Sequence, residues 1–122
     1  MVTLTEKGRA GDVVLYHVPE YSIDTEVLTA GALYEVGSVL GRVTATDALA
    51  MSAPGASDGS QTPIGVLVEE TDATDGARSA PVLKRHARII RSGLVFEATI
   101  DTAAERQAAI DALATVGIIS DS

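Results

Sequence analysis

The sequence predicts a mainly β fold of the α+β class: a small β-rich single domain with short strands, one C-terminal amphipathic helix and an extended N-terminal arm. Three observations predict it. Short apolar runs, separated by Gly or small polar residues, fill the chain from residue 27 to residue 100. A helix-capping sequence follows at residues 102–105, and the first twelve residues are polar and contain Gly. Because 122 residues suffice for one domain, we expect an arm over residues 1–25 and a β-rich domain over residues 26–122.

The expected arm contains one short β-prone run, Val13, Val14, Leu15 and Tyr16. Pro19 ends this run, because proline has no amide proton to extend a strand ladder. Two interpretations follow. The run is either part of an extended arm that meets a partner, or an ordinary first strand that pairs with the sheet of its own domain.

The central part of the chain predicts a series of short strands. We expect them over residues 27–28, 33–37, 38–44, 63–68, 81–91 and 94–100, with loops over 51–62 and 69–80. The run from Pro63 to Val68 is almost continuously apolar, which is typical of a strand covered on both faces. Gly41 lies within an alternating segment, where we expect it to admit the close approach of another backbone.

A single helix is predicted near the end of the chain. Thr102 and Glu105 form a capping box, in which the two side chains can satisfy free amide groups of the first turn. Apolar residues then recur at helical spacing, at Ala109, Ile110, Leu113 and Val116. Gly117 follows where a left-handed residue commonly ends a helix.

Composition excludes several classes of function. Nine Lys and Arg against seventeen Asp and Glu give a formal net charge of −8, which repels nucleic acid, and only 3% of residues are aromatic. The chain has no Cys, and no stretch approaches the length of a membrane span, so we expect no membrane partner. We find no nucleophile or phosphate-binding motif and no histidine pair at metal-ligand spacing. We therefore expect no catalytic residues, metal or cofactor. If the protein were an enzyme, a hydrolase that uses Asp and His would be the best candidate.

Each of two charged clusters can be interpreted either as an ordinary surface feature or as a functional site. Four acids between residues 69 and 75 lack the spacing of a calcium loop, so a solvated turn is the expected structure. Lys84, Arg85, Arg88 and Arg91 form the main basic concentration of the chain and are a candidate partner contact. Alternatively, they pair across a hairpin with the acids of the preceding connection.

The order of features along the chain resembles a known family. The segments that carry the resemblance are Leu28-Thr29-Ala30-Gly31, Gly37-Ser38-Val39-Leu40-Gly41 and, most specifically, Ser57-Asp58-Gly59-Ser60-Gln61-Thr62-Pro63-Ile64-Gly65-Val66-Leu67. Ala80-Pro81-Val82 and the final Leu113-Ala114-Thr115-Val116-Gly117-Ile118-Ile119 follow in similar order and spacing. Together they resemble the head decoration proteins of tailed bacteriophages, the family of the lambda decoration protein D.

This resemblance implies a structural protein of a phage or prophage capsid. Members form homotrimers on the outer surface of the expanded head, bind the major capsid protein and stabilise the shell, and their N-terminal arm adds a strand to the capsid. The implied location is the outer surface of the virion, with the host cytoplasm as the site of assembly. In the arm, Val13 to Tyr16 would then contact the capsid by strand pairing. The alternative is a free-standing oligomeric β-rich interaction module, associated with a tail or a receptor and equally non-enzymatic.

Overall fold

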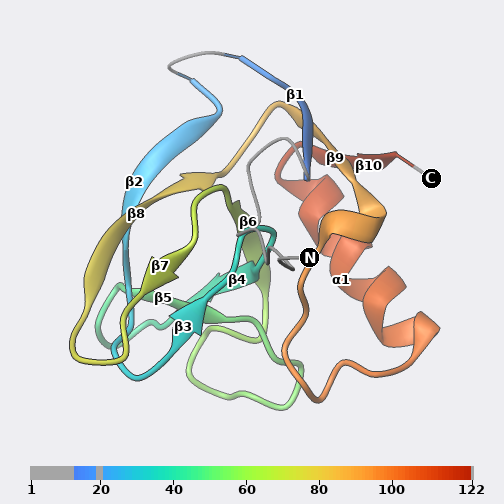
Figure 1. Ribbon diagram of the computed structural model, residues 1–122. Coiled ribbons are helices and arrows are strands. Elements are labelled where there is room, and N and C mark those ends of the chain that lie inside the picture. Colours follow the sequence, from blue (N-terminus) through green and yellow to red (C-terminus); the bar gives the residue numbers. More distant parts are fainter. Residues whose placement is uncertain (1–12, 19–20, 122) are drawn as a thin grey trace, which may run out of the picture.

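A computed structural model describes residues 13–18 and 21–121 of the chain, and this part is β-rich with short strands, as the sequence predicts (Figure 1). The strands are β1 (Val14–His17), β2 (Ile23–Leu28), β3 (Leu33–Tyr34), β4 (Val39–Arg42), β5 (Leu49–Met51), β6 (Pro63–Leu67), β7 (Thr71–Asp72), β8 (Arg78–Leu83), β9 (Ala87–Ile90) and β10 (Ile118–Asp121). A 3₁₀ helix covers Arg91–Gly93, and α1 covers Ala103–Thr115.

Five strands close into a barrel in the order β2-β5-β4-β6-β8. Neighbouring residues of a strand point to opposite faces, so the apolar runs of the barrel strands supply two cores. One apolar cluster fills the interior of the barrel, and all five barrel strands contribute to it. Leu40, Leu67 and Val82 belong to this cluster. Val39 and Val66, one position earlier on β4 and β6, belong to the second cluster outside the barrel. The near-continuous apolar run over residues 63–68 is therefore covered on both faces, as predicted.

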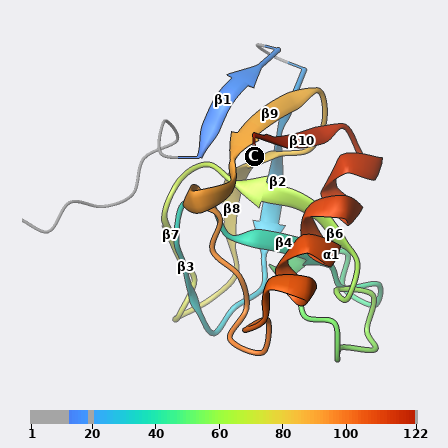
Figure 2. The same cartoon turned by 90° about the vertical axis from the view of Figure 1, so that its right-hand side faces the viewer.

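The second core is covered by α1 and by a separate three-stranded sheet of order β1-β9-β10. Figure 2 shows these three strands lying above the barrel, with α1 running down one side. In this sheet β1 runs antiparallel and β10 parallel to the central strand β9. Because β1 is the first and β10 the last described strand, both ends of the described chain meet in this sheet.

The helix begins and ends where the sequence predicts. Thr102 is the N-cap, and its side-chain oxygen accepts a hydrogen bond from the Glu105 amide at 3.2 Å. The second half of the expected capping box differs, because the Glu105 carboxylate accepts from the Thr102 hydroxyl at 2.9 Å and not from its amide. Gly117 follows the helix with φ of 89°, the left-handed conformation that an αL end requires.

Two predicted strands are corrected. Residues 81–91 do not form one strand, because β8 ends at Leu83 and β9 begins at Ala87. His86 between them has φ of 49°, and its carbonyl accepts a hydrogen bond from the buried Ser22 hydroxyl at 3.0 Å, so the chain turns from the barrel into the outer sheet. Residues 94–100 form no strand; Val95 makes only an isolated bridge to Ser38.

The run from Val13 to Tyr16 was expected either in an extended arm or in a strand paired with its own domain, and in the structure it is paired. Val13 is fully buried in the outer core, and its carbonyl accepts from the Ile90 amide at 2.7 Å. β1 then pairs along β9 from Val14 to His17. The expected boundary at residue 25 falls inside β2, and residues 1–12 of the expected arm lie outside the described residues.

Candidate functional site

The outer face of the β1-β9-β10 sheet presents a row of exposed side chains, one from each strand. Arg88 on the central strand is paired with Tyr16 of β1 on one side and with Ile119 of β10 on the other. The Tyr16 side chain is 59% exposed and Ile119 is 46% exposed, which is high for apolar residues of this size. The opposite face of the same strands is buried in the core through Ala87, Ile89 and Ile118.

A β-bulge explains why two adjacent residues of β1 are both exposed. The register with β9 shifts between Val14 and Tyr16, which leaves Leu15 opposite no single residue. Leu15 is 51% exposed beside Tyr16. Of the four residues predicted to bind a partner through the arm, Val13 is thus a core residue, Val14 is half-buried, and Leu15 and Tyr16 reach solvent.

The four predicted basic residues lie in different surroundings. Lys84 and Arg85 face β2, where the Lys84 Nζ lies 2.6 Å from the Glu26 carboxylate and the Arg85 Nη2 lies 2.6 Å from that of Asp24. Lys84 and Arg85 thus pair with carboxylates of β2, whereas the acids of the preceding connection were the expected partners. Arg88 projects from the exposed face of the outer sheet. Arg91 begins the 3₁₀ helix and donates to the Gln107 side chain at 2.7 Å.

The barrel carries an ion-pair network made of Asp24, Glu26, Arg42, Lys84 and Arg85. Glu26 lies at its centre, 2.8 Å from Arg42 and 2.6 Å from Lys84, with its side chain only 15% exposed. The hydrogen bond from Arg42 is the main cause that lowers the pKa of Glu26 below its ordinary value. The hydrogen bond from Arg85 does the same for the pKa of Asp24. These ion pairs join β2 to β4 and to the segment that follows β8.

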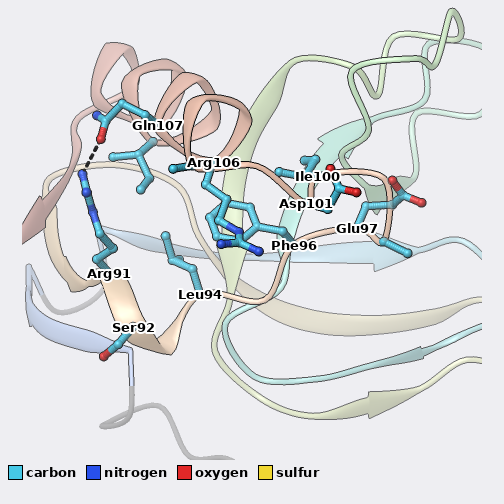
Figure 3. A pocket seen from close by; sticks show the side chains of 12 residues that line it. Arg91, Ser92, Leu94, Phe96, Glu97, Ile100, Asp101, Arg106 and Gln107 are labelled. Atoms are coloured by element: carbon cyan, nitrogen blue, oxygen red, sulfur yellow. Dashed lines mark hydrogen bonds between the residues drawn. The ribbon is translucent and has the colours of Figure 1, made fainter.

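A cleft of about 650 Å³ lies between α1 and the segment that follows β9 (Figure 3). Leu94, Phe96 and Ile100 give it apolar walls, while Arg91 and Arg106 approach it from the 3₁₀ helix and from α1. The sequence did not reveal this cleft, because its lining residues, between Arg91 and Ile110, come from the segment after β9 and from α1, and no local pattern joins them.

The acidic connection forms a turn and not a metal site. The Asp72 carboxylate accepts from the amide of Thr74 at 3.0 Å and from its hydroxyl at 2.6 Å, which lowers the pKa of Asp72. Within residues 13–18 and 21–121, no three His, Asp or Glu side chains are placed to hold a metal ion. No helix in that part of the chain is long and apolar enough to cross a membrane.

The sequence did not reveal two exposed residues of the outer sheet region, Ile119 and Tyr21. Ile119 was named only in the final segment that resembles the family, yet it is exposed on β10 opposite Arg88. Tyr21 is 48% exposed, and its ring lies 5.0 Å from that of His86. A signal existed for Tyr21, since a chain with four aromatic residues places Tyr21 close to the predicted strand run that ends at Tyr16.

The described residues form a small β-rich domain, and several large apolar side chains are exposed on or beside its outer sheet. The sequence model of one family, described as bacteriophage lambda head decoration protein D, matches residues 3–118, nearly the whole chain. The chain therefore belongs to this family of phage head decoration proteins. The family is one of structural capsid proteins of the virion and is not an enzyme class. No curated protein matches the chain.

Proposed function

We propose that this protein binds the outer surface of the expanded phage head as a homotrimer, contacts the major capsid protein and stabilises the shell. The family match over residues 3–118 is the observation that carries the proposal, because it identifies a head decoration protein. The same match favours this function over a free-standing interaction module of a tail or receptor complex. Assembly would take place in the host cytoplasm, before the virion leaves the cell.

The exposed β1 strand supports a contact by strand addition. In the sheet order β1-β9-β10, β9 covers one edge of β1, and no described strand pairs with the other edge. Such an edge can accept a strand of another protein, whose backbone hydrogen bonds supply affinity while side chains set the register. Leu15 and Tyr16, both about half exposed, stand beside this edge.

The pairing of β1 with β9 lowers the entropy cost of binding below that expected for a free arm. Ordering a free backbone costs about 1–2 kcal/mol per residue. Because residues 14–17 already pair with β9, this cost does not fall on the binding step at those residues. We infer that β1 acts as a preformed edge, and that three such edges in a trimer strengthen binding through multivalency.

A trimer brings together three chains of net charge −8. Their mutual repulsion requires that contacts between copies be apolar or locally paired. The gain for the shell is mechanical, because one trimer that holds several capsid proteins at once opposes their separation under outward pressure.

Cosedimentation with purified heads tests this function. Wild-type protein is mixed with expanded and unexpanded heads that lack decoration protein, and the bound fraction is measured after pelleting. We expect saturable binding to expanded heads and little to unexpanded ones. Equal binding to both forms, or to neither, would contradict the proposal.

The role of β1 needs variants that leave the core intact. Deletion of residues 1–20 would remove the buried Val13, so the suitable change is Leu15→Ser, at an exposed residue. Val27→Ser on the barrel strand β2 is its control, because Val27 is 45% exposed. We expect weaker head binding for the first variant and unchanged binding for the second; equal affinity of the two variants would argue against a contact at β1.

A further inference from the structure

Two Asp-Gly dipeptides, Asp58-Gly59 and Asp75-Gly76, lie in loops of this chain. An Asp side chain that precedes glycine can close on the main chain, because glycine has no side chain to shield its nitrogen. The nitrogen forms a bond to the carboxyl carbon of a protonated Asp, and the carboxyl hydroxyl leaves with the amide proton as water. Water then opens the resulting succinimide ring at either carbonyl, which gives Asp or isoaspartate. The sequence alone makes both dipeptides equal candidates for this reaction.

The structure holds the reacting groups of Asp58-Gly59 apart. The Asp58 carboxylate accepts hydrogen bonds from the Ser60 amide at 3.0 Å and from the Ser60 hydroxyl at 2.6 Å. The Gly59 nitrogen, which would attack, donates to the Gln61 side-chain oxygen at 2.9 Å. The bonds from Ser60 also lower the pKa of Asp58, which favours the ionised carboxylate over the more reactive neutral acid. Both reacting groups must therefore lose partners before the ring can close.

Neighbouring main chain also fixes this first dipeptide. The Asp58 carbonyl accepts a hydrogen bond from the Thr44 amide at 2.8 Å. Gly59 has φ of 105°, and its Cβ position lies 2.7 Å from the Arg42 carbonyl oxygen, so little space surrounds it. Ring closure requires rotation about the bonds of the Asp residue, which these contacts resist.

Asp75-Gly76 lies in an open turn between β7 and β8, on the side of the barrel away from α1 (Figure 1). Asp75 is exposed, and within residues 13–18 and 21–121 its carboxylate has no hydrogen-bond or ion-pair partner. The Gly76 amide donates a long hydrogen bond of 3.3 Å to the Ala73 carbonyl, and nothing lies within 4 Å of the Gly76 Cβ position. Here ring closure requires only that one weak contact be lost.

We propose that Asp75 is a site of spontaneous isomerisation to isoaspartate, and that the fold protects Asp58 from the same reaction. Water is the only reactant besides the chain itself, because the carboxyl and the attacking nitrogen belong to adjacent residues. The family is one of virion proteins, and a virion protein is not replaced after assembly. Isoaspartate at residue 75 therefore accumulates with the age of the particle.

The modified residue would lie in a connection that is fixed at both ends. Ala73 is fully buried, its amide donates to the Ala32 carbonyl at 2.9 Å, and its carbonyl accepts from the Gly31 amide at 2.7 Å. Arg78 begins β8. Isoaspartate keeps the negative charge of the residue but adds one carbon atom to the main chain between these two anchors. We expect residues 74–77 to absorb this atom by losing the turn hydrogen bond, which lowers the melting temperature of the aged protein.

The test compares the two dipeptides within one chain. Purified protein is aged for several weeks, either folded and well below its melting temperature, or unfolded in guanidinium chloride at the same temperature and pH. A protease that cleaves after Glu separates the two sites, because Glu69 and Glu70 lie between them. Isoaspartate in each peptide is then measured by enzymatic methylation of its carboxylate and by mass spectrometry with fragmentation that distinguishes the isomers.

Two variants change one dipeptide each. Gly76→Ala places a Cβ atom in open space, so the fold is kept while the attacking nitrogen is shielded. Gln61→Ala removes the side-chain acceptor of the Gly59 amide at an exposed residue. Thermal melting of both fresh variants checks that they fold as wild type does.

We expect isoaspartate to form at least about tenfold faster at residue 75 than at residue 58 in the folded protein, and within about threefold of the same rate in the unfolded chain. Gly76→Ala should slow the reaction at residue 75 at least about tenfold, and Gln61→Ala should raise the rate at residue 58 about fivefold. A folded rate at residue 75 that does not exceed the rate at residue 58 would overturn the proposal. So would a tenfold difference that persists in the unfolded chain, because the fold would then not be its cause. Aged wild type should melt below fresh protein while aged Gly76→Ala does not, and equal losses in the two would overturn the assigned effect on the turn.

Discussion

Gly41→Ala tests how closely two backbones pass in the barrel. A Cβ atom at residue 41 would lie 2.2 Å from the carbonyl oxygen of Ser60 and 2.8 Å from its carbonyl carbon and Cα. Such distances require the backbone at Ser60 to withdraw by about 1 Å, into a loop that is already fixed. The Asp58 carboxylate accepts from the Ser60 amide at 3.0 Å and hydroxyl at 2.6 Å, and the Thr44 amide donates to the Asp58 carbonyl at 2.8 Å.

Overpacking of this kind costs about 3 kcal/mol of unfolding free energy, at the upper end of the usual range, because backbone and not a flexible side chain must move. In a domain of this size that corresponds to a fall in melting temperature of roughly 10 °C. Gly55→Ala is the control, since nothing lies within 4 Å of its Cβ position, and we expect it to stabilise by about 0.5 kcal/mol. Differential scanning calorimetry measures both. A Gly41→Ala variant that melts within about 2 °C of wild type would refute the close approach.

Three further changes test the packing and the charges. Glu26→Gln leaves Arg42 and Lys84 partly buried without their shared carboxylate, and we expect it to lower the free energy of unfolding by about 2 kcal/mol, measured by urea denaturation. Its control is Glu35→Gln at an exposed turn, which should leave the stability unchanged. Equal stabilities of the two variants would show that the ion-pair network contributes nothing. Because folding lowers the pKa of both carboxylates of that network, its contribution is present above about pH 4 and is lost as the pH falls through the lower folded values. A pH series of urea midpoints should therefore show a steeper acid loss in wild type than in Glu26→Gln, and parallel curves would contradict this. Leu113→Ala removes a fully buried side chain of α1 and should cost about 3 kcal/mol; a loss below about 1 kcal/mol would mean that the helix does not anchor the outer core.

Local features of the fold were predictable, because they depend on few neighbouring residues. The cap at Thr102 and the left-handed Gly117 follow from the chemistry of helix ends. The tight contact at Gly41 follows from a glycine placed in an apolar strand, although the sequence does not say which backbone approaches it. The prediction that one β-rich domain carries one helix near its end is confirmed by these same elements.

Features that depend on distant partners were not predictable. The break between β8 and β9 is made by Ser22, whose carbonyl accepts from the Lys84 amide at 2.7 Å and whose hydroxyl donates to the His86 carbonyl. The alternating pattern of the sequence does not reveal these contacts, so it predicted one strand where the structure has two. Likewise, the acids nearest in sequence to Lys84 were expected to pair with it, but the antiparallel β2 and β8 bring Glu26 beside it from 58 residues away.

The candidate site shows the same limit. Leu15 and Tyr16 were predicted to contact a partner, and they stay predictions, but the sequence did not reveal that β1 is held in place by β9. It also separated Arg88 from Ile119 by thirty residues, which the parallel pairing of β9 and β10 places side by side. A surface assembled from three strands is visible only once the topology is known.

Electron cryo-microscopy of expanded heads with and without the protein shows directly whether the protein binds the outer surface of the shell as a trimer. We expect added density on the outer surface of the shell, with the shape of a trimer, whose copies turn the β1-β9-β10 sheet toward the capsid protein. Added density on the inner surface, single copies in place of trimers, or an outer sheet that faces solvent would contradict it.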